Sequence, residues 1–246
     1  MLLCVQVLPL MQSLQKSIKN SLRQELLALK DLKHQNFCAK LLPNLEKPKI
    51  IGVKTKPIRD LAKRVFKTSL TEYLNDSSPN VYFEENLLEC YILALYLQKQ
   101  WNPKLIHTFV LRIDNWWVCD SFCAALKGLD EVRLWELVMP YLNTQSPYVL
   151  RFGIVMLLKT QEIPKALLCL SKIKHKDYYV QMAIAWVISV HFIYDSNIVL
   201  EFLEKKRFTT WIHNKAIQKI CESLRASIED KQRVKALFIQ SKNANR

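Results

Sequence analysis

The stretch IDNWWVCDSFCAAL, residues 113–126, carries the pattern on which the fold rests. Successive residues of an α-helix are rotated by about 100°. At that spacing one side of the helix carries Val118, Phe122, Ala125, Leu126 and Leu129. The apolar stripe predicts a helix packed on a hydrophobic core. Trp116, Asp120 and Lys127 fall on the opposite side, and we interpret Trp117, between the two faces, as a core or boundary residue.

The same helical spacing of apolar residues recurs along almost the whole chain. No stretch alternates between apolar and polar residues for long enough to favour a β-strand. Only 3 glycines occur, and the 9 prolines lie mostly between periodic segments, which favours helices over hairpins. We therefore expect an all-α fold. The predicted helices lie near residues 8–30, 33–42, 56–74, 82–99, 103–113, 115–128, 130–142, 147–160, 163–172, 177–194, 196–205, 211–225 and 229–240.

From about residue 82 onward the predicted helices are short and follow one another in pairs. Each pair spans roughly 30–40 residues, which is the length of a HEAT-type unit. We predict a single domain over residues 1–246, a HEAT-like helical-repeat solenoid, or α-α superhelix. In such a stack one helix of each pair lines a concave face, which suits an elongated ligand.

The chain is strongly basic, with 36 Lys and Arg against 22 Asp and Glu and a formal net charge of +14. This charge indicates a polyanionic partner, either nucleic acid or a membrane surface. The basic clusters comprise Lys54, Lys56, Arg59, Lys63, Arg64 and Lys67, then Lys172, Lys174 and Lys176, then Lys205, Lys206, Arg207, Lys215 and Lys219. They would give the solenoid a concave basic face, although each cluster could equally be an ordinary solvated helix face.

No transmembrane helix is expected. The longest uncharged apolar stretch, about residues 182–194, is shorter than the roughly 18–20 residues that a spanning helix requires. The apolar start, MLLCVQVLPLMQ, lacks the basic region and cleavage site of a signal peptide, so we interpret it as a helix packed on the domain. The expected location is cytoplasmic.

The 7 cysteines include no CxxC pair, and no nearby His pair completes a metal set. We interpret them as reduced structural thiols and expect no metal site. Signatures of other enzyme classes, such as GxSxG, HExxH or a Walker loop, are absent from the sequence.

Trp116 and Asp120 form an unusual pair for a helix of this kind. A tryptophan off the core stripe is either covered by the next repeat or presented at a binding surface. A carboxylate at i+4 projects beside the indole, so an aromatic face and a negative charge would act together. Such a pair would stabilise a cation.

Arg151 lies in a predicted helix, SPYVLRFGIVMLLK, that is apolar nearly all round. An arginine in such surroundings is either one half of a structural ion pair or a phosphate clamp, since a guanidinium matches phosphate geometry. Trp186 shares its helix face with Tyr179, Met182 and Val190, so periodicity alone would place it in the core.

Five stretches in this order resemble the DNA alkylation repair proteins of the AlkD type. They are IIGVKTKPIRDLAK (50–63), NWWVCD (115–120), YVLRFGI (148–154), YYVQMAIAWVIS (178–189) and NKAIQKICES (214–223). The resemblance implies a HEAT-like solenoid whose active members are DNA glycosylases for cationic N3- and N7-alkylated purines. They use no metal and no organic cofactor. The family's W-x-x-x-D motif falls on Trp116 and Asp120, its arginine on Arg151 and its A-x-x-W tryptophan on Trp186.

The resemblance also implies a mechanism. An alkylated purine already carries positive charge, so it leaves as a neutral base while charge develops on the deoxyribose. Trp116 and Trp186 would form an aromatic platform for that charge, and Asp120 would stabilise it and orient water at C1′. DNA would be gripped by its backbone, without base flipping, through Arg151, Lys54, Lys56, Arg59, Lys174 and Lys215. The expected partner is alkylated double-stranded DNA. Separately, the sequence shows no exposed heptad seam, so we expect a monomer.

Two alternatives remain at this stage. A non-catalytic nucleic-acid-binding solenoid would keep the basic face but tolerate the loss of Asp120. A HEAT-like protein scaffold would bind DNA only weakly, with no preference for a lesion, and would hold a protein partner at its concave face.

Overall fold

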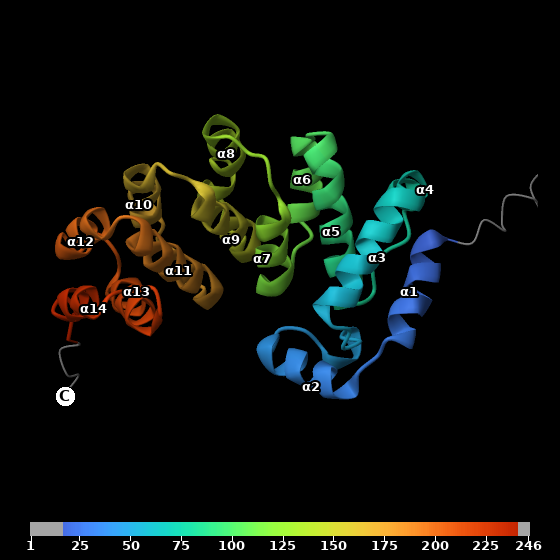
Figure 1. Cartoon of the computed structure of the whole chain (residues 1–246), viewed down its shortest axis with the longest axis horizontal. Helices are drawn as coiled ribbons and strands as arrows, with labels where there is room; N and C mark the ends of the chain where they lie inside the picture. Colours follow the sequence, from blue (N-terminus) through green and yellow to red (C-terminus); the bar gives the residue numbers. More distant parts are fainter. Residues whose placement is uncertain (1–16, 241–246) are drawn as a thin grey trace, which may run out of the picture. The chain divides into compact units, whose positions relative to one another are not determined.

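The computed structural model describes residues 17–240 (Figure 1). Within this range all regular elements are α-helices or short 3₁₀-helices, which confirms the predicted all-α fold. The first predicted helix, residues 8–30, is described only from Ile18, and its earlier part lies outside the described residues, as does the apolar start of the chain. No helix in the described range is long and apolar enough to cross a membrane.

The chain divides into two compact units, the first ending at Lys99 and the second beginning at Gln100. The elements of the N-terminal unit are α1 (Ile18–Ala28), α2 (Leu32–Leu41), η1 (Lys47–Lys49), α3 (Thr55–Thr68), α4 (Leu70–Asn75) and α5 (Phe83–Lys99). Those of the C-terminal unit are α6 (Pro103–Val110), α7 (Trp116–Ala125), α8 (Glu131–Val138), η2 (Tyr141–Asn143), α9 (Pro147–Met156), η3 (Leu157–Lys159), α10 (Ile163–Lys172), α11 (Tyr178–Tyr194), α12 (Ser196–Glu204), α13 (Thr210–Glu222) and α14 (Ile228–Lys235). A single solenoid over residues 1–246 stays a prediction.

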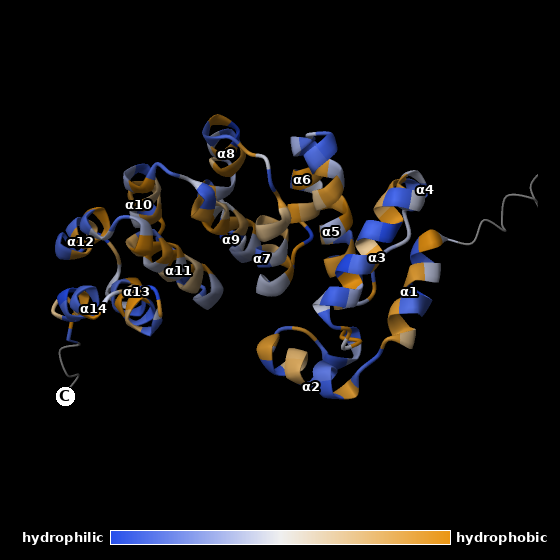
Figure 2. Ribbon diagram, in the orientation of Figure 1, coloured by the Kyte–Doolittle hydropathy of each residue, from blue (hydrophilic) through white to orange (hydrophobic). Residues whose placement is uncertain are grey.

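The core of the N-terminal unit forms where α3 packs on α5. In α3 the buried residues recur at helical spacing as Ile58, Leu61, Ala62 and Val65, while the rest of the helix is largely basic. Figure 2 shows both hydrophobic and hydrophilic positions along α3. Burial of each of the three larger side chains, Ile58, Leu61 and Val65, contributes about 1.5–3 kcal/mol. The apolar stripe therefore fixes which side of α3 faces solvent.

The loop before α3 is held by a buried carboxylate. Glu84, in the first turn of α5, is fully buried and accepts hydrogen bonds from the backbone amides of Ile51, Gly52 and Val53 at 2.9, 2.6 and 3.2 Å. Burial raises the pKa of Glu84, and these amide donors oppose that shift. Gly52 has φ +94°, a conformation that favours glycine. The loop thereby sets the start of α3.

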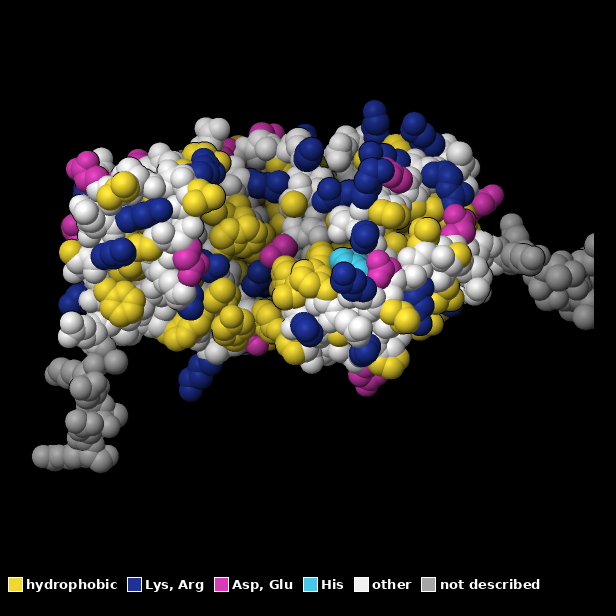
Figure 3. Space-filling view, turned by 60° about the horizontal axis from the view of Figure 1, so that its bottom comes forward, with side chains coloured by type: hydrophobic (Ala, Val, Ile, Leu, Met, Phe, Trp, Pro, Cys, Tyr) yellow, Lys and Arg dark blue, Asp and Glu magenta, His cyan; other side chains and the backbone are white. Residues whose placement is uncertain are grey.

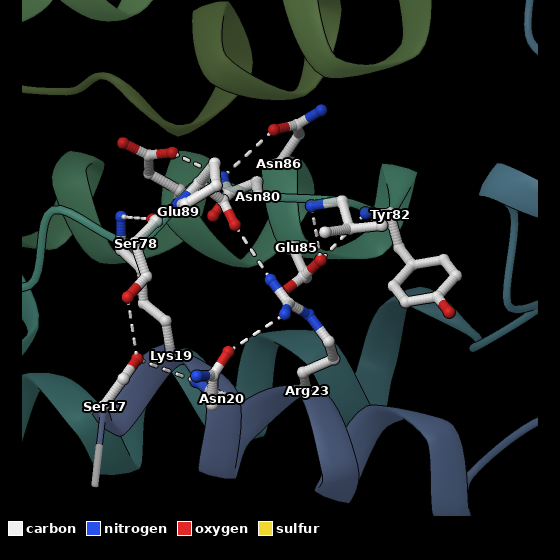
Figure 4. A network of polar contacts seen from close by, with 12 residues as sticks. Ser17, Lys19, Asn20, Arg23, Ser78, Asn80, Tyr82, Glu85, Asn86 and Glu89 are labelled. Atoms are coloured by element: carbon white, nitrogen blue, oxygen red, sulfur yellow. Dashed lines mark hydrogen bonds and ion pairs between the residues drawn. The ribbon is translucent and has the colours of Figure 1, made fainter.

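Helix α1 is joined to the rest of its unit by a polar network at one side (Figure 4). The Arg23 guanidinium donates to Glu85 at 2.8 Å and to the Pro79 carbonyl at 2.8 Å. Asp76, which ends α4, accepts from the Ser17 hydroxyl at 2.6 Å and from the Lys19 amide at 3.0 Å. Only two residues of α1 are buried, so polar contacts carry much of its attachment.

In the C-terminal unit the odd-numbered helices form one layer. Helix α7 packs on α9, α9 on α11, and α11 on α13. The intervening helices lie to one side, with α8 against α9 and with α12 against both α10 and α11 (Figure 1). Because neighbours in the layer are separated by one intervening helix, each helix pair adds one step to the stack. This layer positions the candidate site.

Several helix ends differ from those expected. The predicted helix at 56–74 is divided at Ser69, which has φ −146° and separates α3 from α4. The helices predicted at 130–142 and 147–160 end earlier and continue as the short turns η2 and η3. In both places the apolar pattern continues through the 3₁₀ turn, so periodicity alone did not reveal the change.

Candidate functional site

The candidate site centres on an ion pair between Asp120 on α7 and Arg151 on α9. The Arg151 Nε and Nη2 atoms donate to the two carboxylate oxygens of Asp120, each at 2.8 Å. This two-point contact fixes the carboxylate plane as well as its position. The structure therefore joins two residues that the sequence had placed on separate helices, and it contains the ion pair considered for Arg151.

Arg151 also reaches the next helix of the layer. Its Nη1 donates to the backbone carbonyl of Tyr179, in the first turn of α11. One side chain on α9 thus contacts α7 on one side and α11 on the other. A carbonyl oxygen has two lone pairs, so that of Tyr179 can accept from Arg151 in addition to its place in the backbone of α11, while the Tyr179 side chain lies against Tyr148. Periodicity gives no signal for a contact made by a backbone carbonyl.

Both charged groups are largely removed from solvent. The side chain of Arg151 is 7% exposed and that of Asp120 is 18% exposed. Burial raises the pKa of the Asp120 carboxyl, while the hydrogen bonds and positive charge of Arg151 act against this shift. The pKa of Arg151 is raised, because the contacts with Asp120 outweigh the effect of its burial. Since the guanidinium stays charged and donates twice, the pair favours an ionised Asp120.

Trp116 is the first residue of α7 and lies one turn before Asp120. The side chain of Asn115 caps the helix by accepting from the Val118 amide at 2.9 Å, which makes Trp116 the first helical residue. Trp116 and Trp117 stack with ring centroids 5.5 Å apart and planes inclined by 21°. Both indoles are partly exposed. Two adjacent aromatic faces therefore stand at the same helix end as the carboxylate.

Trp186 lies in the middle of α11 and is partly exposed, although Ala183, Ile184, Ala185 and Val187 around it are buried. Tyr179, Met182 and Val190, which share its helix face, are also partly exposed, so this face is not the core face that periodicity predicts. Trp116 and Trp186 belong to helices on either side of α9, within one layer.

Two cysteines fasten α7 to α9 beneath the ion pair. Cys119 and Cys123 are buried, and their thiols donate to the carbonyls of Tyr148 and Phe152, each at 3.8 Å. Burial raises the pKa of the Cys123 thiol, so it stays protonated. The described cysteines are free, and in residues 17–240 no group of three or more His, Cys, Asp or Glu side chains is arranged to hold a metal ion.

The basic residues of the N-terminal unit lie around the start of α3. Lys54 Nζ is 3.9 Å from Asp31, and Lys56 Nζ is 3.2 Å from Asp60. The guanidinium of Arg59 lies over the Tyr91 ring, 5.1 Å from its centroid. All three cations are exposed, so these neighbours leave them accessible to a further anion.

The basic residues of the C-terminal unit lie near the starts of α11 and α13. Lys174 precedes α11 and its Nζ donates to the Ser171 carbonyl at 3.0 Å. Lys215 on α13 donates to Gln218 at 2.7 Å, and its Nζ lies 5.7 Å from the centroid of the Trp211 ring. Contact of any of these cations with DNA stays a prediction.

The sequence analysis missed Glu84 and the carbonyl of Tyr179. Helix α5 begins FEENLLEC, and three glutamates in an otherwise apolar helix are a signal that Glu84, Glu85 and Glu89 have buried donors.

Comparison with known proteins gives one match. The family model described as DNA alkylation repair enzyme matches residues 22–220, which include α7, α9 and α11 in full. Searches of curated proteins and of solved structures found no match.

Proposed function

Because this chain belongs to the DNA alkylation repair enzyme family, we propose that it is a monofunctional DNA glycosylase for cationic N3- and N7-alkylated purines. In this proposal it acts on duplex DNA and hydrolyses the bond between the damaged base and C1′ of the deoxyribose. The base leaves without being flipped into a pocket.

The observation that supports this proposal most directly is the position of Asp120. Its carboxylate lies one helical turn from Trp116, and two hydrogen bonds from Arg151 fix its orientation. As the bond to a cationic purine breaks, the base becomes neutral and positive charge develops on the sugar. A preorganised carboxylate stabilises that charge and orients water, and indole faces add about 0.5–2 kcal/mol each. These are the roles proposed for Asp120, Trp116 and Trp186.

We assign Arg151 a positioning role toward Asp120. Its Nε, Nη1 and Nη2 atoms all donate within the protein. A phosphate would be bound by the remaining N–H groups of the guanidinium, next to a carboxylate that is already held. Arg151 would therefore keep Asp120 ionised and oriented while contributing positive charge toward the DNA backbone.

The layer α7, α9, α11 and α13 supports a HEAT-like stack in the C-terminal unit. Its alternating helices pack in chain order, as repeated helix pairs do. We propose that Lys54, Lys56, Arg59, Lys174 and Lys215 contact phosphates and provide most of the affinity.

Burial of Arg151 favours a second candidate, a DNA-binding protein without catalysis. An arginine that is 5% exposed and whose guanidinium bonds to both α7 and α11 could serve stability alone. In that case the pair would join α7, α9 and α11, and Asp120 would not act on DNA.

Release of free base from duplex DNA containing N7-methylguanine separates the two candidates. Single-turnover rates and DNA affinities would be compared for the wild type, Asp120→Asn and Glu136→Gln at fixed salt. Glu136→Gln is the matched control, because it removes one negative charge from an exposed position on α8.

A glycosylase releases base above the spontaneous rate, Asp120→Asn loses that release while keeping its affinity, and Glu136→Gln resembles the wild type. Binding of DNA by the wild type without any release would instead establish the non-catalytic candidate.

A further inference from the structure

A chain of aromatic rings leads away from the Arg151 contact along the helix layer. Tyr148 on α9 contacts Tyr179 on α11, with ring centroids 5.8 Å apart. Tyr179 meets Tyr178 edge to face at 5.4 Å, and Tyr178 meets Trp211 on α13 at 6.0 Å, again near perpendicular. We refer to Tyr148, Tyr179, Tyr178 and Trp211 as the aromatic row. It runs across three neighbouring helices, all in the C-terminal unit.

Every ring of the aromatic row lies in the first turn of its helix. Tyr148 follows Pro147 at the start of α9, Tyr178 begins α11, and Trp211 is the second residue of α13. The two outer rings are the more exposed ones, Tyr178 at 57% and Trp211 at 38%, while Tyr148 and Tyr179 are half-buried. Rings so exposed contribute little to the core. Their edge-to-face packing also holds two of them at a fixed angle, with aromatic surface open to solvent.

Lysines surround this end of the row. Lys215 lies above the Trp211 ring, Lys172 ends α10, and the loop before α11 contributes Lys174 and Lys176, all exposed. Within residues 17–240, neither Lys174 nor Lys215 has a carboxylate within 4.0 Å of its Nζ atom. Lys174 donates to the Ser171 carbonyl and Lys215 to the Gln218 side-chain amide oxygen. The nearby Asp177 is used to cap α11, where it accepts from the amides of Tyr179 and Val180. Figure 3 shows hydrophobic and basic side chains interspersed on the face of this unit.

We propose that the outer part of the aromatic row, Tyr178 and Trp211 with Lys174 and Lys215, binds unpaired nucleotides. Aromatic side chains stack with bases of any sequence, and lysines beside them neutralise the phosphates, which is the combination found in single-strand-binding surfaces. The net charge of +14 fits a polyanion, and exposed aromatic rings beside lysines favour a nucleic acid with unpaired bases over an acidic peptide. The tyrosine and tryptophan ring faces supply the part of the surface on which bases stack.

This surface extends beyond the proposed excision chemistry. The row includes Tyr179, whose carbonyl accepts from Arg151, so a strand that leaves the duplex near the candidate site would meet Tyr179, Tyr178 and Trp211 in order. Binding of unpaired nucleotides does not require that Asp120 be catalytic. The two proposals can therefore fail separately.

Affinity for single strands tests the proposal. The probes are a thymidine oligonucleotide of about 12 nucleotides and an abasic oligomer with the same number of phosphates. Variants Tyr178→Ala and Trp211→Ala are compared with Tyr194→Ala, while Trp211→Phe tests whether an aromatic ring restores binding. Tyr194 is a matched control, because it lies at the other end of α11, is 66% exposed and has Arg225 over its ring at 5.5 Å. Circular dichroism melts establish that each variant is folded.

The thymidine strand should bind more tightly than the abasic one. Tyr178→Ala and Trp211→Ala should each weaken it by roughly 5- to 150-fold, the range for loss of one stacked base. Trp211→Phe should retain most of the affinity and Tyr194→Ala all of it. Equal affinity for the two probes, or equal losses in the Tyr194 control, would overturn the proposal. The rate at which Trp211→Ala releases base from duplex DNA, measured in parallel, shows separately whether the excision chemistry is affected.

Discussion

At the residue scale, Arg151 links charge, orientation and helix packing in one side chain. Its two hydrogen bonds to Asp120 oppose the rise in pKa that burial causes. If the ionised carboxylate is the active form, the rate of base release falls as the pH drops through this pKa. The acid limb should therefore lie above 3.8, the ordinary value for Asp.

Replacement of Arg151 tests its positioning role. Arg151→Gln removes the positive charge that lowers the pKa of Asp120, so the pKa rises further and the acid limb moves to higher pH. Activity at neutral pH falls and is partly recovered in more alkaline buffer. Single-turnover rates across a pH series, corrected for spontaneous depurination, measure the shift. A role confined to phosphate binding would weaken DNA affinity and leave the pH profile where it was.

Gly52 offers a prediction about stability, with a control elsewhere in the chain. A Cβ at this position would lie 2.3 Å from the Asp31 carbonyl oxygen and 2.6 Å from the Gln35 amide nitrogen, and φ is +94°. At Gly128 φ is +75° but nothing lies within 4 Å of the added atom. Gly128→Ala should cost about 1–2 kcal/mol from backbone conformation alone. Gly52→Ala should lower the free energy of unfolding, measured with urea, by clearly more than Gly128→Ala does. Equal losses in the two variants would show that the loop around Gly52 relaxes to accept the added methyl group.

At the element scale, α1 buries only Leu22 and Leu26 and is held to its unit by polar contacts as well, among them those of Asp76. Burial would raise the pKa of Asp76, but hydrogen bonds from Ser17, Ser78 and the Lys19 amide outweigh it, and the pKa lies below its ordinary value of 3.8. A lowered pKa means that the ionised form is favoured in the folded state. Its contribution is present above pH 3.8 and is lost as the pH falls toward the lower folded value.

Loss of this carboxylate should release α1 before other helices. In Asp76→Ala, amide hydrogen exchange should accelerate in residues 18–28 at neutral pH, while α9 and α11 exchange as in the wild type. Asp130→Ala, which removes the N-cap of α8 in the other unit, is a matched control. Unchanged exchange in α1 would mean that Arg23 and the two buried leucines suffice to hold it.

The sequence predicted helices better than it predicted their partners. Residues 163–172 form a helix with the expected bounds, and most others differ only at their ends. Ser69 divides a predicted helix because a single residue leaves helical geometry, which an apolar period of three or four does not detect. The pairing of Asp120 with Arg151 is a contact 31 residues apart. Periodicity shows which side of a helix each residue occupies and gives no information on which helix faces it.

At the scale of the whole molecule, the net charge of +14 makes DNA affinity depend on salt. The logarithm of the binding constant for duplex DNA should fall linearly with the logarithm of salt concentration, with a slope of about −0.9 per phosphate contacted. Lys56→Gln and Lys215→Gln, one in each unit, should each make the slope shallower by about 0.9. Fluorescence anisotropy over a salt series measures it, and Lys99→Gln, at the end of α5, provides a comparison outside the proposed contacts. An unchanged slope would remove the substituted lysine from the DNA interface.

The contacts of Arg151 also limit how the site could be transplanted or altered during evolution. The candidate carboxylate, Asp120, belongs to α7, the arginine that orients it to α9, and the second acceptor of that arginine to α11. A graft of the α7 segment alone would carry the motif without its geometry. A change in the spacing of successive helices would require all three helices to shift together. The geometry of the site therefore depends on three stacked helices and not on one short segment.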